Sequence, residues 1–241
     1  MNIKCLKGFL LIFCCTIFFN NLVQGQSFWF GSKVGPGLNF QSWGSGNNTT
    51  GINRDVAFSF NGDIFIESYD QLGRGSMYAA LGYHSRGSAV RFFSFNNDVL
   101  NQTYRFNNVV LEVGFKKAAA RIKSLETYFL LGVRGEYTVS NNLGSFNQAG
   151  NLFFPSKEFV RNINYGVTAG GGFEFYLSPM SNGFVEFSIH PDISIQYEQP
   201  PIANVMDPFG NRVNLPLTQV RNLSMELKFG IKFLRKVEYI D

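Results

Sequence analysis

The feature that most constrains the fold is a period-two alternation of apolar and polar residues, which recurs eight times between positions 28 and 233. Successive side chains of a β-strand point to opposite faces, so each such segment predicts a strand with one apolar and one polar face. The clearest segment is 185–198, which reads VEFSIHPDISIQYE and puts Tyr197 on the apolar face. No stretch after residue 25 is apolar and long enough for a membrane-spanning helix. The alternation therefore predicts an all-β protein.

The spacing of these segments indicates how the strands connect. The predicted strands are the segments 28–41, 55–69, 77–95, 104–116, 127–140, 164–176, 185–198 and 223–233. The connectors alternate in length: 42–54, 141–161 and 199–217 are long, whereas 70–76 and 177–182 are short. Short turns at one end and longer loops at the other are typical of outer-membrane barrels. Strands of this length also match a tilted bilayer crossing of about 9–11 residues.

The polar faces carry charges in the middle of strands, which leaves two possible architectures. In a soluble sandwich these charges face water, whereas in a membrane barrel they fill the interior and the apolar faces meet lipid. Backbone groups have no partners in lipid, so a membrane sheet has to close on itself. The aromatic content of 16%, the loop asymmetry and the leader described next favour the second architecture. We therefore expect an eight-stranded antiparallel up-and-down transmembrane β-barrel.

The first 25 residues read as a secretory signal peptide. Two lysines precede an apolar stretch, Gly8–Phe19, and small residues lead to an expected cleavage site ahead of Gln26. All three cysteines lie in this leader, so the exported chain is expected to contain no disulfide. We expect residues 26–241 to form the barrel domain, located in the outer membrane, with a retained N-terminal anchor as the alternative for the leader.

Charges on the polar faces are expected to pair inside the barrel, because a desolvated charge without a partner is costly. The predicted lumen network, with a structural role, comprises Lys33, Glu67, Arg86, Glu112, Arg134, Glu136, Glu174, Glu186, His190, Asp192, Glu226 and Lys228. Lys116 is expected to join it, and so is His84, near the extracellular rim. Eight strands make a narrow barrel that side chains can fill, so we expect a filled lumen and no open diffusion pore.

Candidate catalytic residues are few. Ser188, His190 and Asp192 form a Ser-His-acid group of the kind that lipid A deacylases of the outer membrane use, but all three point into the barrel, away from acyl chains. No metal-ligand spacing is present, and the runs Gly35–Gly37 and Gly170–Gly172 open no helix and are not phosphate loops. We therefore expect no cofactor, no metal and no enzymatic activity.

Net charge and loop composition limit the kinds of partner that the chain is expected to bind. Removal of the leader takes two of 21 basic residues and no acid, which lowers the net charge from +4 to about +2 and gives no support to nucleic-acid binding. Outer-membrane lipid is the expected surrounding. The loops 141–161 and 199–217 carry aromatic residues and prolines that either contact a protein partner or ligand or pack over the barrel mouth. We favour a structural or interaction role through these loops, with a lipid-modifying enzyme and a small-solute channel as alternatives.

Three strand segments carry a family resemblance. The segments 31–40 (GSKVGPGLNF), 81–88 (LGYHSRGS) and 106–114 (FNNVVLEVG) resemble the PorT-type outer-membrane β-barrel family, and the resemblance covers nearly the whole mature chain. It implies an eight-stranded barrel of mostly undefined role, with one branch tied to protein secretion. The fourth segment lacks the proline that family members tend to carry there, and the chain continues past Phe233 to Asp241. Both departures weaken the transfer of a secretion role, which stays a further alternative.

Overall fold

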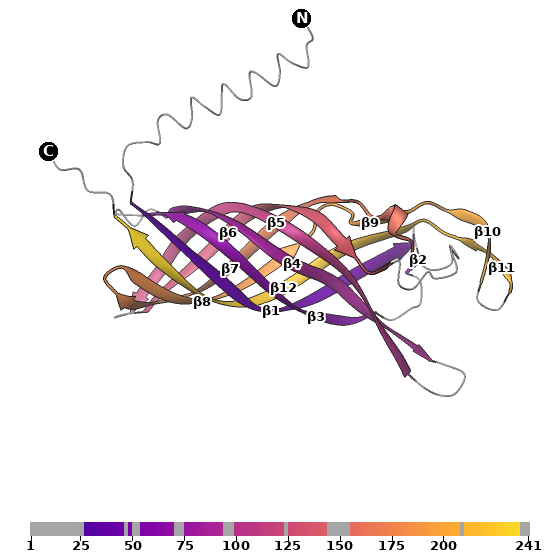
Figure 1. Ribbon diagram of the computed structural model, residues 1–241, viewed down its shortest axis with the longest axis horizontal. Coiled ribbons are helices and arrows are strands. Elements are labelled where there is room, and N and C mark those ends of the chain that lie inside the picture. The colour runs from indigo at the N-terminus through magenta and orange to yellow at the C-terminus, as the bar shows by residue number, and fades with distance from the viewer. Residues whose placement is uncertain are drawn as a thin grey trace, which may run out of the picture.

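Eight long antiparallel strands close into a barrel in the computed structural model, which describes residues 27–45, 48–49, 54–69, 75–93, 99–122, 125–143, 155–207 and 210–236. The barrel strands are β1 (Phe28–Ser45), β3 (Arg54–Ser68), β4 (Ser76–Phe93), β5 (Val99–Ile122), β6 (Leu125–Asn141), β7 (Ile163–Ser178), β8 (Ser181–Pro191) and β12 (Thr218–Arg235). Each pairs with the next along the chain, and β12 pairs back onto β1 from Phe28↔Arg235 to Gly44↔Gln219 (Figure 1). This closure confirms the predicted up-and-down barrel.

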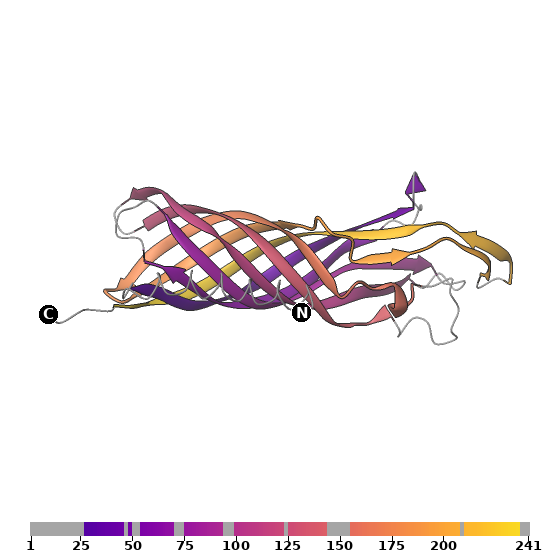
Figure 2. The ribbon, with the colours of Figure 1, turned by 90° about the horizontal axis from the view of Figure 1, so that it is seen from above.

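The remaining elements gather at one end of the barrel. They are β2 (Asn48–Thr49), the 3-10 helix η2 (Lys157–Phe159), β9 (Tyr197–Gln199), β10 (Ile202–Met206) and β11 (Arg212–Leu215). The strands β10 and β11 form a hairpin that projects beyond the barrel, whereas β1 begins and β12 ends at the opposite end (Figures 1 and 2). Long loops mark the extracellular end of such barrels and short turns the periplasmic end. Among the described residues, no helix has the length and apolar character to cross a bilayer.

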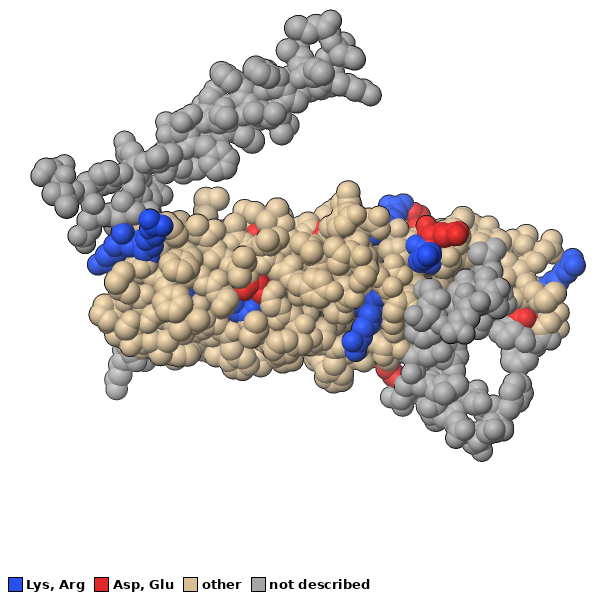
Figure 3. Space-filling view, viewed as in Figure 1, with Lys and Arg blue, Asp and Glu red and all other residues tan. Residues whose placement is uncertain are grey.

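The two faces of the wall separate apolar from polar side chains. On β3, Phe58 and Phe60 are 73% and 70% exposed on the outside, whereas Asn61 and Asp63 are buried inside. The same outward apolar face recurs around the barrel, and the barrel surface in Figure 3 shows few charges between its two ends. Exposed phenylalanines on a closed wall exclude the soluble sandwich. They face lipid, as the alternation predicts.

The seventh predicted strand, 185–198, is not continuous, and its predicted face for Tyr197 is wrong. The strand β8 ends at Pro191, which has no backbone N–H to donate to the ladder. The chain then bends, because the N–H groups of Ile193 and Ser194 both donate to Tyr165 O. The bend shifts the alternation, so that Tyr197 is fully buried in the lumen instead of facing lipid.

Two connectors also differ from the prediction. The fourth strand extends beyond 104–116 at both ends, and the expected connector 117–126 shrinks because β5 and β6 continue to pair up to Ile122↔Leu125. The expected loop 199–217 contains the β10–β11 hairpin. Its turn is fixed by Gly210 at φ +86°, whose N–H donates to Asp207 O over 3.0 Å. The runs of alternating apolar and polar residues in these segments are too short to predict strands.

Glycines on the inward faces of β1 and β7 make room for neighbouring groups. A Cβ at Gly172 of β7 would lie 2.8 Å from the Tyr128 hydroxyl. A Cβ at Gly35 of β1 would lie 1.9 Å from the backbone oxygen of Leu227 on β12. The first glycine admits a tyrosine into the lumen, and the second lets two strands approach closely at the seam.

Candidate functional site

The twelve residues of the predicted lumen network all lie inside the barrel with buried side chains. The structure brings most of them into one central cluster, and it places Glu67 and Glu174 in a separate group at the periplasmic end. A third feature, an aromatic cap, lies at the extracellular end. These features, together with a layer around Lys33 and Glu186, fill the lumen and make up the candidate site.

Glu226 of β12 is the hub of the central cluster. Its Oε1 accepts hydrogen bonds from Asn61 Nδ2 and Arg86 Nη1, each over 2.8 Å, and lies 3.1 Å from His84 Nδ1. Its Oε2 lies 2.5 Å from Lys228 Nζ. A carboxylate that is 1% exposed is thus surrounded by donors from two other strands and its own. The hub ties the β12 side of the wall to β3 and β4 across the lumen.

A chain of alternating charges leads from this hub toward the extracellular side. Arg86 Nη2 donates to Glu136 Oε1 over 3.0 Å, and the same oxygen lies 2.8 Å from Arg134 Nε. Arg134 in turn donates to Asp192, whose second oxygen accepts from Asn222 Nδ2 over 2.6 Å. Opposite charges therefore occur at matching depths, which is the condition for keeping them desolvated.

The two histidines meet at mid-height in the lumen. Their ring centroids are 6.2 Å apart, and His84 Nε2 lies 2.6 Å from Asp63 Oδ1. The expected position of His84 near the extracellular rim is therefore wrong, because β4 continues well beyond it to Phe93. His84 instead links Asp63 with the hub, Glu226.

The Ser188–His190 pair has part of the geometry of a hydrolase. Ser188 Oγ lies 2.9 Å from His190 Nε2, and Thr168 Oγ1 lies 3.1 Å from His190 Nδ1. The acid of the sequence pattern, Asp192, instead bonds to Arg134 and Asn222. Ser188 and His190 are 1% and 2% exposed, so no substrate reaches this pair in the conformation described. The arrangement fits a lumen network better than a triad.

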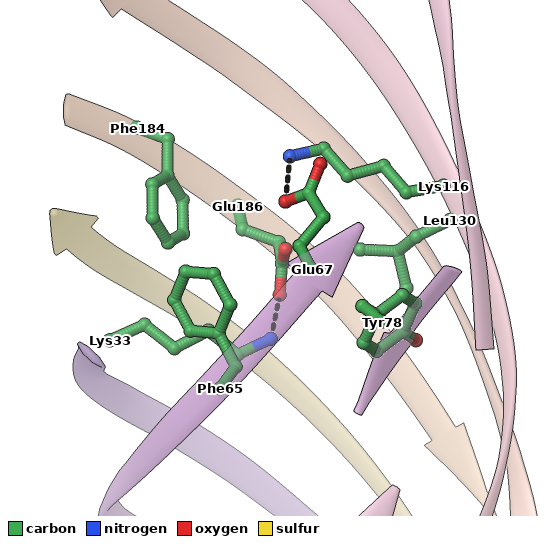
Figure 4. Close-up of a pocket in the computed structure, with 8 residues that line it drawn as sticks. All are labelled: Lys33, Phe65, Glu67, Tyr78, Lys116, Leu130, Phe184 and Glu186. Carbon is green, nitrogen blue, oxygen red and sulfur yellow. Dashed lines mark hydrogen bonds and ion pairs between the residues drawn. The ribbon is translucent and has the colours of Figure 1, made fainter. Parts of the chain in front are cut away.

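Below the hub lies a layer that mixes ion pairs with large apolar side chains. Lys33 Nζ lies 2.6 Å from Glu186 Oε1, with Phe65 and Phe184 on one side of the pair and Tyr78 on the other (Figure 4). The cavity between these side chains measures about 20 Å³, room for about one water molecule. Ion pairs and large side chains therefore fill the lumen at this depth.

The periplasmic charge group contains two lysines and two glutamates. Lys116 and Lys232 each pair with both Glu67 and Glu174, with Lys232 Nζ 2.7 Å from Glu174 Oε1. Lys116 also lies over the ring of Tyr128, 3.9 Å from its centroid. These charges form the floor of an open vestibule of about 670 Å³ at the periplasmic mouth.

The extracellular end of the lumen is closed by an aromatic cap, whose buried members are Trp43, Tyr104, Phe106, Leu143, Tyr197 and Val220. The ring of Trp43 is tilted against those of Tyr104 and Tyr197, with centroid distances of 5.7 Å and 5.5 Å. Phe159 of η2 packs on the cap with its ring nearly perpendicular to that of Tyr197 and the two ring centroids 6.2 Å apart. The described part of the loop 141–161 therefore packs over the mouth, whereas its aromatics Phe146, Phe153 and Phe154 lie outside the described residues.

Sequence reasoning left out several lumen residues. Asp63 and Lys232 alternate with apolar residues on their strands, so their place on the polar face was available as a signal. Tyr78 and Tyr128 are less evident, because an aromatic residue suits either face. Tyr78 Oη donates to Glu112 Oε1 over 2.5 Å, and Tyr128 Oη donates to Glu186 Oε2 over 3.1 Å. Among the described residues, no three acidic, histidine or cysteine side chains are grouped so that they could hold a metal ion.

No protein-family model and no curated protein matches the chain. Solved structures share its fold: the outer membrane protein OprG from Pseudomonas aeruginosa is 12% identical, with a TM-score of 0.54, over 87% of this chain and 96% of that one. Neisserial surface protein A is 10% identical, with a TM-score of 0.42, over 86% and 96% of the two chains. The closed barrel, its apolar outer face and the likeness to OprG define the chain as a small integral outer-membrane β-barrel protein.

The expectation that the chain is not an enzyme needs correction. The outer membrane protease OmpT from Escherichia coli is also among the similar structures, with 9% identity and a TM-score of 0.35, over 88% of this chain and 94% of that one. An identity this low shows a shared fold alone. Since barrels of this kind include a protease, the fold does not decide whether the chain catalyses a reaction.

Proposed function

We propose that this protein is a closed outer-membrane barrel that acts by binding a partner at its extracellular end. The observation that carries the proposal is the filled lumen. The cluster around Glu226, the layer around Lys33 and the aromatic cap occupy successive depths of the barrel. A solute has no continuous path through these layers, so function is assigned to a surface at an end of the barrel.

In this proposal the lumen charges have a structural role. Each carboxylate of the predicted network has a cationic or hydrogen-bonding partner within the lumen, such as Glu112, which accepts from Thr168 Oγ1 over 2.9 Å. Partners come from strands that are not hydrogen-bonded neighbours, as with Lys33 on β1 and Glu186 on β8, which β12 separates. Cross-lumen pairs of this kind hold the wall in one register, because breaking one leaves a buried charge alone.

The extracellular elements supply the proposed binding surface. The β10–β11 hairpin stands beyond the barrel mouth with Met206 exposed by 56%, and the neighbouring Pro200 and Pro201 are exposed as well. Exposed apolar side chains outside the lipid zone suit contact with a partner. The partner is proposed to be a protein or ligand in the medium or on the cell surface, held by the hairpin and the loop that contains η2.

Conductance of planar bilayers tests the closed lumen. Folded full-length protein is expected to add no stepwise current, because the ionic layers and the cap both block the path. The matched variant Tyr197→Ala removes one cap residue and is expected to stay silent, since the charge layers remain. Stepwise current from the folded unmodified protein would overturn the proposal and favour a solute channel.

Site-specific photo-crosslinking in intact cells tests the extracellular surface. A photoreactive amino acid at position 206, on the hairpin, is expected to give an adduct with a macromolecule that is absent when the same group replaces Leu131. Leu131 is 58% exposed on the outer wall, so a photoreactive group there is expected to label lipid. Identical labelling patterns at the two positions would contradict a binding role for the hairpin.

We also propose that the resemblance to the PorT-type family reflects common ancestry. Support comes from the motif 31–40, whose Gly35 and Gly37 flank Pro36 at the β1–β12 seam. The seam has a steric need for glycine at position 35, because a Cβ there would clash with the backbone of β12. An experimental structure of a PorT-type protein tests the relationship. Common ancestry predicts the same close approach of the two seam strands at a glycine, and a seam formed by other strands would count against it.

A further inference from the structure

A segment of β5 at the periplasmic end has an open edge. Strand β4 accompanies β5 only as far as Ser76↔Lys116, whereas β5 continues to Ile122 and pairs there with β6 alone. Within the described residues, no other strand pairs with 118–122 on the β4 side. An edge of this kind presents backbone donors and acceptors to any extended chain that approaches it.

The direction of the backbone groups identifies Ala118 as part of that edge. At Arg105 the main-chain N–H and C=O both bond to Asn142, on the β6 side of β5. Backbone groups alternate between the two sides of a strand, so those of even-numbered residues point to the β4 side as far as Ala118. A register shift follows between Ala118 and Ala120. Ala118 therefore offers an N–H and a C=O to the open side.

The side chains around this edge leave it accessible. Residues Ala118–Ala120 are exposed and carry only methyl groups. They line the periplasmic vestibule of about 670 Å³ together with the aromatic residues Trp29, Tyr69 and Tyr176. Natural edge strands are usually covered or blocked by bulky or charged side chains. Here an edge lined by methyl groups adjoins a concave surface with aromatic walls, a combination that suits an extended peptide.

The charge of the mouth restricts the kind of peptide. Lys117, Arg121, Arg235 and Lys236 are exposed at this rim, and none has an ion-pair partner among the described residues. The floor lysines are different, because Lys116 and Lys232 are matched by Glu67 and Glu174. Among the described residues that line the mouth, Glu126 is the one acidic residue left to balance the four rim cations. Lys and Arg side chains gather at the corresponding end in Figure 3.

We propose that the periplasmic mouth binds an extended, acidic polypeptide segment, which adds as a strand to the open edge of β5. Main-chain hydrogen bonds to the edge at Ala118 provide affinity, and alternate side chains of the peptide point into the vestibule. Carboxylates of the peptide pair with Arg121 and Lys236, which both line the vestibule. This site lies at the opposite end of the barrel from the proposed extracellular surface and does not depend on it.

Fluorescence anisotropy with a designed peptide tests the site on the full chain folded in detergent micelles. The probe is a short labelled peptide in which Glu alternates with Thr, and its counterpart has Lys in place of Glu. The acidic peptide is expected to bind and the basic one to fail, because the rim cations attract one and repel the other. An acidic peptide that is N-methylated at alternate amides is expected to bind about fivefold more weakly or worse, since it cannot complete the strand ladder.

Protein variants separate the edge from the charges. Ala118→Pro removes the edge N–H and is expected to weaken binding about fivefold, whereas Ala118→Val keeps the N–H and is the control for bulk. The double variant Arg121→Glu with Lys236→Glu is expected to weaken binding about tenfold. Arg212→Glu on the extracellular hairpin makes a charge change of the same kind and is expected to leave binding unchanged. Heat-modifiable gel migration checks that each variant is folded.

Three results would overturn the proposal. The first is failure of the acidic peptide to bind the folded unmodified protein, in which case Lys117 and Arg121 only guard the edge against aggregation. The second is equal binding of the acidic and basic peptides. The third is full binding of the N-methylated peptide, which tests the edge even if the Ala118→Pro barrel does not fold.

Discussion

Glu226 shows at the scale of one residue how this barrel tolerates charge in its interior. Its two oxygens contact Asn61, His84, Arg86 and Lys228, so removing its charge leaves two buried cations without their shared partner. Breaking a buried pair by removing one partner costs about 3–5 kcal/mol. We expect Glu226→Gln to lower the free energy of unfolding in lipid vesicles by about that amount, measured by urea titration of tryptophan fluorescence.

The control for this variant is a charge pair of the same type at the surface. Arg161 and Glu198 pair at the extracellular end with side chains that are 55% and 30% exposed. Water and ions screen such a pair, so Glu198→Gln is expected to cost less than about 1 kcal/mol. If the two glutamine variants unfold at the same urea concentration, the hub does not stabilise the barrel.

At the scale of the strand, the seam between β1 and β12 depends on glycine. A Cβ at Gly35 would clash with Leu227 O at 1.9 Å and with the Cα of Lys228 at 2.8 Å. We expect Gly35→Ala to destabilise the folded barrel by about 1–3 kcal/mol or to prevent closure, because backbone atoms cannot move aside cheaply. Gly135→Ala is the matched control, since a Cβ there meets no atom within 4 Å. Refolding yield on gels and urea titration measure both, and an equal yield would refute the steric argument.

The strands also show what the sequence alone can predict. Alternation places Phe58, Asp63 and Arg86 on their correct faces, because a side chain of a strand can point to only one of two faces. It fails at Tyr197, where Pro191 ends β8 and the bend that follows reverses the faces. Pairs such as Lys33–Glu186 join residues 153 positions apart, so their distance depends on the stagger of the closed barrel. Alternation therefore predicts which side chains enter the lumen, whereas the geometry of the closed barrel decides their partners.

At the scale of the whole molecule, the orientation of the wall relative to lipid has a direct test. Leu131 lies near the middle of β6 and is 58% exposed on the outer face, whereas Met206 is 56% exposed on the extracellular hairpin. Placing arginine at the bilayer centre of a barrel costs about 2–4 kcal/mol, and placing it in water costs little. We expect Leu131→Arg to lower the free energy of unfolding in vesicles by this amount and Met206→Arg to leave it within about 0.5 kcal/mol. Leu131 and Met206 are similar in size and exposure, so a difference in stability between the two variants indicates that a membrane surrounds the barrel. Equal stability of the two variants would mean that the phenylalanine-rich outer face meets no lipid, and the barrel would then be a soluble one.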